Sequence, residues 1–209
     1  MSDSNKELTS IWTPANIVTC VRIVFIPIFM VCSAISFEGS TTDGFGFSFE
    51  PTFAILAFVL YVILSLTDKV DGYLARSRNE VTDFGKFLDP IADKLLVFSA
   101  LLLFLQYGAV TVWSVFIILF REFLVSALRM VASANGVVVA ADKLGKWKTA
   151  VTMVSLCGYL FAFMLAAIGS ELCVQIFFLS RILMAAAVIL TVVSGVQYFW
   201  NCRKIVFSV

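Results

Sequence analysis

Long apolar stretches alternate with short polar segments along this chain. Each is long enough, at about 1.5 Å of helical rise per residue, to approach or cross the hydrocarbon core of a bilayer. The stretches lie at 16–36, 52–68, 87–106, 110–128, 149–169 and 173–200. The pattern predicts an all-α membrane protein, a six-transmembrane-helix bundle in a single domain spanning residues 1–209. A short interfacial helix near 4–12 is expected before the first span.

The composition identifies the bilayer as the solvent of this fold. Hydrophobic residues make up 61% of the 209 positions and charged residues 14%, whereas a soluble domain is usually about half apolar and about a quarter charged. One water-soluble core cannot hide that much apolar surface. The net charge is only +1 and no basic run is present, so a nucleic-acid partner is not expected.

Lys and Arg occur in alternate connections between the predicted spans. The segments 69–86 and 129–148 carry several basic residues, whereas 37–51, 107–109 and 170–172 carry none. Basic residues concentrate on the cytoplasmic side of membrane proteins. Both termini and the two basic segments are therefore expected in the cytoplasm.

Four aspartates lie at the predicted cytoplasmic ends of the second and third spans. Asp68 and Asp71 are three residues apart, and Asp89 and Asp93 are four apart, so each pair shares one face of a helix. The two spans are antiparallel neighbours joined by a short loop, so the pairs can converge. Carboxylates at a membrane boundary are costly unless neutralised, and oxygen ligands suit Mg²⁺ or Mn²⁺. Since histidine is absent, the sequence predicts a carboxylate site for one or two divalent cations.

Two alternatives to a catalytic site remain at this point. Single aspartates could have structural roles, with Asp68 paired to Lys69 or Lys94 and Asp93 capping a helix. A divalent-cation transporter could use the same carboxylates for translocation. Transport is disfavoured because the acidic residues cluster at one end of the predicted bundle and the other half offers little acidic lining.

The segment from Asp68 to Asp93 reads D-x2-D-G-x2-A-R-x8-G-x3-D-x3-D. This pattern resembles the signature of the CDP-alcohol phosphatidyltransferases, in which an alcohol attacks a CDP-linked lipid and CMP leaves. The resemblance implies that Asp68, Asp71 and Asp89 bind two Mg²⁺ or Mn²⁺ ions. It implies that Asp93 is the general base and also touches a metal, in an active site at the cytoplasmic end of the bundle.

Further segments resemble the branch of this family whose acceptor is sn-glycerol 3-phosphate. They are Asn16, Thr19, Arg22 and Pro27 in the first span, Arg121-Glu122 and 126–129 in the fourth, and 143–149 before the fifth. The resemblance covers most of residues 14–155 and implies CDP-diacylglycerol and sn-glycerol 3-phosphate as substrates. The residues it assigns to the CDP-lipid are Gly72, Ala75, Arg76, Gly85, Asn16 and Thr19. Those it assigns to the acceptor are Arg121, Arg129, Lys146 and Lys148.

Several points remain open beside this resemblance. Sister branches with the same site would make cardiolipin or phosphatidylinositol phosphate. Arg129, Lys146 and Lys148 could instead be topology charges. Arg121 lies inside an apolar span and needs neutralisation, but Glu122 is adjacent in sequence and is expected to point elsewhere on the helix. The resemblance also implies a homodimer, embedded as a multi-pass protein in a bacterial inner (plasma) membrane.

Overall fold

The computed structural model describes residues 13–38, 50–77, 83–134 and 143–206 of the chain. Its helices are α1 (Pro14–Glu38), α2 (Pro51–Ser77), α3 (Asp83–Gln106), α4 (Val112–Ala134), α5 (Lys143–Ala167) and α6 (Leu172–Val206). No strand occurs in these described ranges, so the all-α prediction is confirmed. The expected interfacial helix at 4–12 lies outside them.

Three of the described helices are long and apolar enough to cross a membrane. Their apolar spans are Asn16–Phe37, Leu144–Ala167 and Leu172–Asn201, and α2 holds a shorter apolar segment at Pro51–Thr67. Helices of this length and composition fit an integral membrane protein. The count of six spans stays a prediction.

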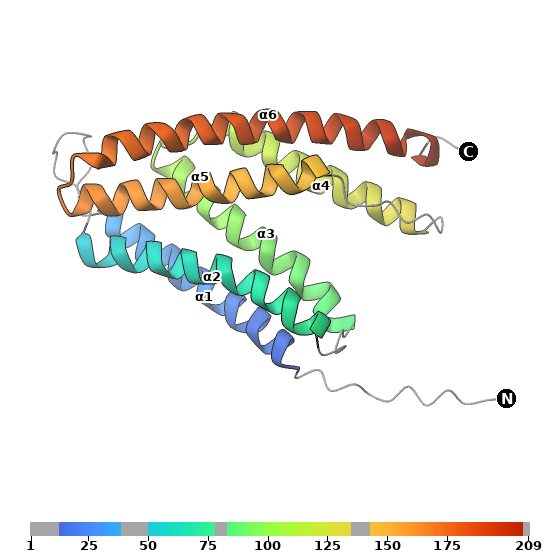
Figure 1. Cartoon of the computed structure of the whole chain (residues 1–209), viewed down its shortest axis with the longest axis horizontal. Helices are drawn as coiled ribbons and strands as arrows, with labels where there is room; N and C mark the ends of the chain where they lie inside the picture. Colours follow the sequence, from blue (N-terminus) through green and yellow to red (C-terminus); the bar gives the residue numbers. More distant parts are fainter. Residues whose placement is uncertain (1–12, 39–49, 78–82, 135–142, 207–209) are drawn as a thin grey trace.

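The helices form two antiparallel pairs with α3 between them (Figure 1). α1 packs against α2, α5 packs against α6, and α4 packs mainly against α6. α3 contacts α1, α2, α4 and α5, so it links the two pairs. At one end of the bundle α1, α3 and α5 begin and α2, α4 and α6 end (Figure 1). We call this the polar end, because the aspartate-bearing segments of α2 and α3 lie there.

The helices continue past the predicted apolar stretches at the polar end. α2 reaches Ser77, beyond the predicted 68, and α5 begins at Lys143, before the predicted 149. At the opposite end the agreement is closer, and α3 ends at Gln106 as predicted. Hydropathy detects only the length of a helix that lies in the apolar part of the bilayer. The backbone hydrogen bonds that define the helix continue equally well in water.

Glycines close the turns that follow α3 and α5 at the opposite end. Gly108 and Gly169 have φ angles of 69° and 73°, a conformation that glycine adopts without steric cost. In each turn the amide after the glycine donates a hydrogen bond of 2.9 Å to a carbonyl in the last turn of the helix. This Schellman arrangement satisfies carbonyls that the helix end leaves unpaired. The resulting short connections make α3–α4 and α5–α6 antiparallel neighbours.

Candidate active site

The predicted metal-binding positions lie on helices at the polar end. Asp68 and Asp71 belong to α2, and Asp89 belongs to α3, so each predicted pair has the helical backbone that its spacing requires. α2 and α3 contact each other. The structure does not describe the side chains of Asp68, Asp71, Asp89, Gly72, Ala75 and Arg76. Their convergence on a cation or a nucleotide therefore stays a prediction.

One face of α1 buries polar side chains beside the aspartate-bearing part of α2. Asn16, Thr19 and Arg22 are 3%, 0% and 1% exposed, and their spacing of three residues places them along one face. The Arg22 Nε atom donates a hydrogen bond to the Thr67 hydroxyl over 3.5 Å, directly before Asp68. α1 thus presents a buried polar surface where the CDP-lipid is expected. Sequence reasoning did not assign Arg22 to the site.

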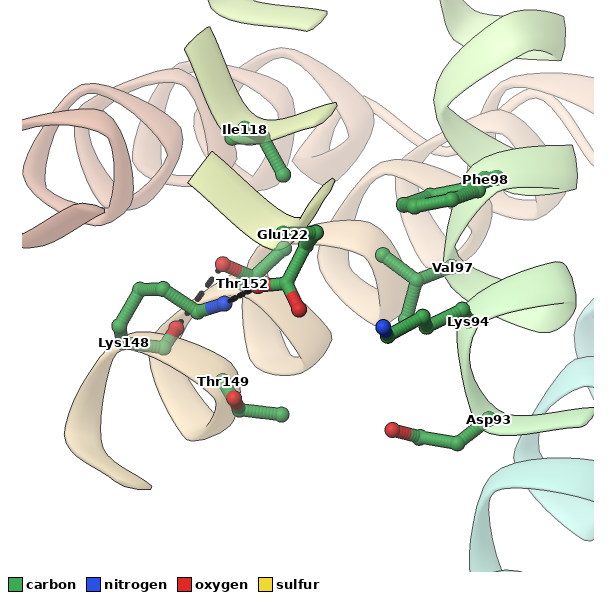
Figure 2. A pocket seen from close by; sticks show the side chains of 9 residues that line it. All are labelled: Asp93, Lys94, Val97, Phe98, Ile118, Glu122, Lys148, Thr149 and Thr152. Atoms are coloured by element: carbon green, nitrogen blue, oxygen red, sulfur yellow. Dashed lines mark hydrogen bonds and ion pairs between the residues drawn. The ribbon is translucent and has the colours of Figure 1, made fainter. Parts of the chain in front are cut away.

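A small pocket lies between α3, α4 and α5 (Figure 2). Asp93 and Lys94 of α3 line one side, and Glu122 of α4 and Lys148 of α5 line the other. The rest of its lining is Val97, Phe98, Ile118, Thr149 and Thr152. The pocket therefore joins the predicted general base, Asp93, to one of the predicted acceptor-binding cations, Lys148.

Glu122 is the centre of an ion-pair cluster in this pocket. Its Oε1 atom accepts a hydrogen bond from Lys148 Nζ and lies 3.4 Å from Arg121 Nη1. The side chains of Glu122, Arg121 and Lys148 are only 18%, 11% and 6% exposed. The Glu122 carboxylate thus neutralises Arg121 and Lys148, whose charges would otherwise be costly to bury.

The expectation that Glu122 points away from Arg121 is wrong. Neighbouring residues diverge by about 100° around a helix, but both side chains are long, and Lys148 of α5 lies within reach of the carboxylate. Sequence reasoning considered Lys94 only as a possible partner of Asp68 and did not assign it to the acceptor site. Its Nζ atom donates to the Ser126 hydroxyl on α4. The sequence signal that could have assigned Glu122 to the site is its charge inside an apolar helix.

Arg129 and Lys146 lie apart from this cluster. The Arg129 Nε atom donates to the Tyr198 hydroxyl over 3.3 Å, and its guanidinium carbon lies 5.7 Å from the centre of that ring. Lys146 is exposed near the start of α5. The structure thus brings together Arg121 and Lys148, whereas it places Arg129 and Lys146 nearer the helix ends. Gly85, also predicted to line the CDP-lipid pocket, is buried on α3.

The pocket has the chemistry to hold a phosphate beside a carboxylate. Its lining supplies two positive charges, from Lys94 and Lys148, and two negative ones, from Asp93 and Glu122. Arg121 adds a third positive charge through its contact with Glu122. Arg and Lys side chains form the strongest hydrogen bonds with phosphate oxygens when water is excluded. A half-buried Asp93 at the edge of the same pocket can accept a proton from a hydroxyl held there.

Comparison with known proteins connects this geometry to a family. The family model for CDP-alcohol phosphatidyltransferase matches residues 12–193. A CDP-diacylglycerol–glycerol-3-phosphate 3-phosphatidyltransferase of Bacillus subtilis (strain 168) is 41% identical over 192 residues, covering 90% of this chain and 96% of that protein. A protein of the same name from Rickettsia bellii (strain RML369-C) is 35% identical over 189 residues, covering 90% and 94%. Another, from Rickettsia felis (strain ATCC VR-1525 / URRWXCal2), is 38% identical over 149 residues, covering 71% and 80%.

Proposed function

Because this chain belongs to the CDP-alcohol phosphatidyltransferase family, we propose that it transfers a phosphatidyl group from CDP-diacylglycerol to sn-glycerol 3-phosphate. The products are phosphatidylglycerophosphate and CMP. The observation that carries the choice of acceptor is the buried pair of cations, Arg121 and Lys148, in contact with Glu122 beside Asp93. A small acceptor that carries a phosphate needs such charges, whereas an uncharged alcohol does not. The names of the relatives favour sn-glycerol 3-phosphate over inositol phosphate among the acceptors that carry a phosphate.

The metal site of this proposal comprises Asp68, Asp71, Asp89 and Asp93, which would hold two Mg²⁺ or Mn²⁺ ions. Enzymes of this family generally depend on divalent metals. The donor set fits, because a chain without histidine offers carboxylate oxygens, and these are the ligands that both ions accept. When bound, the ions supply charge neutralisation and polarisation of the diphosphate.

The CDP-lipid is proposed to lie between α1, α2 and the start of α3. Small residues at Gly72, Ala75 and Gly85 leave room for the nucleotide beside the backbone, and Arg76 pairs with a phosphate. Asn16 and Thr19, which are buried on the face of α1 that also carries Arg22, are proposed to line the same region. This arrangement sets the diphosphate near the aspartates of α2 and α3.

Asp93 is proposed to take the proton of the acceptor hydroxyl. The hydroxyl oxygen then forms a bond to the phosphorus that carries the diacylglycerol. The bond from that phosphorus to the oxygen shared with CMP breaks, and CMP leaves with the electron pair. This role is supported by the pocket lining, in which Asp93 lies together with Lys148, because a base close to the acceptor can orient the reacting groups.

Arg121 and Lys148 are proposed to contact the acceptor phosphate directly. Arg129 and Lys146, nearer the ends of α4 and α5, raise the local concentration of the anion as it enters from water. This division follows burial, because Lys148 is buried and Arg121 nearly so, whereas Arg129 and Lys146 are exposed.

The chain is an integral membrane protein, and its finer placement is part of the proposal. A single domain of residues 1–209 would cross a bacterial inner membrane six times, with both termini and the polar end in the cytoplasm. Alternating basic connections support this orientation. A homodimer is proposed on the family resemblance.

The proposed reaction is tested with the purified full chain in detergent. With Mg²⁺, CDP-diacylglycerol and labelled sn-glycerol 3-phosphate, we expect release of CMP and a labelled lipid, and EDTA should abolish both. Release of CMP only with phosphatidylglycerol or inositol phosphate would indicate a sister enzyme. Absence of CMP with all of these acceptors and with serine would overturn the transferase proposal.

Arg121→Ala should raise the KM for sn-glycerol 3-phosphate and leave the KM for CDP-diacylglycerol nearly unchanged. A hydrogen bond to a charged group contributes about 1.5–3 kcal/mol, so the expected increase is roughly tenfold to a hundredfold. Steady-state kinetics with each substrate varied in turn measures both constants. Arg181→Ala is the matched control, because Arg181 is exposed on α6 and should leave both constants unchanged. An equal rise in both KM values for Arg121→Ala would contradict the assignment.

A further inference from the structure

The side chain of Arg121 lies against two glycines from other helices. A Cβ atom added to Gly195 of α6 would lie 3.1 Å from Arg121 Cγ. A Cβ atom added to Gly145 of α5 would lie 3.3 Å from Arg121 Nη2. Both separations are shorter than the optimum of about 3.5–4.0 Å for contacts between carbon atoms. The stem and the guanidinium of Arg121 therefore each occupy space that an ordinary side chain would take.

Gly195 has no conformational reason to be glycine. It lies inside the continuous helix α6 and is not among the described glycines with positive φ. Glycine weakens a helix interior, so its presence here points to a demand for space. The position is buried, α6 packs against α4, and Arg121 Cγ is the atom a side chain would meet. Gly195 also lies beyond residue 193, where the match to the family ends.

We infer that Gly195 is a positioning residue for the acceptor. By leaving space for the Arg121 stem, it lets the guanidinium reach Glu122 Oε1, and Glu122 lines the proposed phosphate pocket. α6 thereby contributes to the acceptor site through the backbone at Gly195. The inference rests on the proposed function, because it takes Arg121 as a ligand of the acceptor phosphate.

A second glycine separates this role from ordinary helix packing. Gly158 of α5 also faces α6, but a Cβ atom there would meet the hydroxyl of Ser180 and no charged group. Ser180 in turn bonds within α6 and through its carbonyl to Ser155. Gly158→Ala therefore perturbs the α5–α6 packing without touching Arg121, which makes it the matched control for Gly195→Ala.

Gly195→Ala should raise the KM for sn-glycerol 3-phosphate by roughly fivefold, because a displacement of about 1 Å in a reacting assembly can cost a hundredfold and this shift is smaller. The KM for CDP-diacylglycerol should change by less than about twofold, since the CDP-lipid site lies on other helices. Gly158→Ala should lower the Tm while leaving the ratio of the two KM values at its wild-type level. If Gly195→Ala leaves that ratio unchanged, or Gly158→Ala changes it equally, the inference is overturned.

A double substitution tests whether Gly195 acts through Arg121. Arg121→Ala removes the Cγ atom that the new methyl would meet, so adding Gly195→Ala should cause no further rise in the acceptor KM. The same rise in both backgrounds would overturn the inference. If Gly195→Ala alone fails to fold, the double variant should recover the Tm of Arg121→Ala, and failure to recover it would also overturn the inference. A wild-type chain that releases no CMP with sn-glycerol 3-phosphate would instead disprove the proposed function itself.

Discussion

Asp93→Asn should lower kcat by roughly a hundredfold to ten-thousandfold, the range that general acid–base catalysis contributes. Asparagine has nearly the same shape but cannot take a proton from the acceptor hydroxyl. The half-buried carboxylate lines the same pocket as Lys148 and Glu122. The substitution leaves Lys148 in place, so the acceptor should still bind when the base is removed. Turnover measured at saturating concentrations of both substrates isolates this loss from changes in affinity.

Binding measurements distinguish loss of the base from loss of the site. Asp93→Asn should bind CDP-diacylglycerol in isothermal titration calorimetry, because Asp68, Asp71 and Asp89 remain to hold the metal ions of the proposal. Asp93→Glu keeps a carboxylate and should keep more turnover than the asparagine variant. Glu171→Gln, which changes an exposed carboxylate in the turn before α6, should turn over at the wild-type rate. Turnover of Asp93→Asn near that of the wild type would remove Asp93 as the base.

The sequence predicted the helices well where they lie in the membrane and are apolar, and less well where their ends extend into water. Apolar stretches located the six helices that the described residues form, and the end of α3 at Gln106 agrees with the prediction. The continuation of α2 to Ser77 was not visible, because the charged residues after 67 stop the apolar pattern without stopping the helix. A helix that leaves the membrane keeps its hydrogen bonds and changes only its surface composition.

The sequence could suggest candidate site residues where they share one helix, but it could not show contacts between residues of different helices. The spacing of Asp89 and Asp93 indicates a pair, because residues four apart lie on the same face of a helix. The contact of Glu122 with Lys148 joins α4 to α5, and no periodicity links two positions on separate helices. The same holds for Gly195 and Arg121, whose packing depends on how α6 lies against α4. Local rules therefore indicate candidate catalytic positions before they indicate the residues that orient them.

Glu122→Gln should lower the stability of the protein by about 3 kcal/mol, near the lower end of the cost of breaking a buried ion pair. Glutamine keeps the shape of the side chain but removes the charge that neutralises Arg121 and Lys148, which are 11% and 6% exposed. Two cations would then remain together with little solvent between them. The expected result is a fall in Tm measured in detergent, and Glu171→Gln should show no such fall because its carboxylate is exposed.

Adding the acceptor should raise the Tm of Glu122→Gln more than it raises the Tm of the wild type. If Arg121 and Lys148 bind the phosphate, sn-glycerol 3-phosphate restores negative charge to the site, and ligand binding to the folded state raises stability by mass action. The increase in Tm on adding the acceptor should therefore be larger for Glu122→Gln than for the wild type. Glycerol, which lacks the phosphate, should raise both Tm values equally. A smaller response of the variant to the acceptor would mean that Glu122 is needed to hold the two cations in their binding geometry, and that their free charge alone does not bind the phosphate.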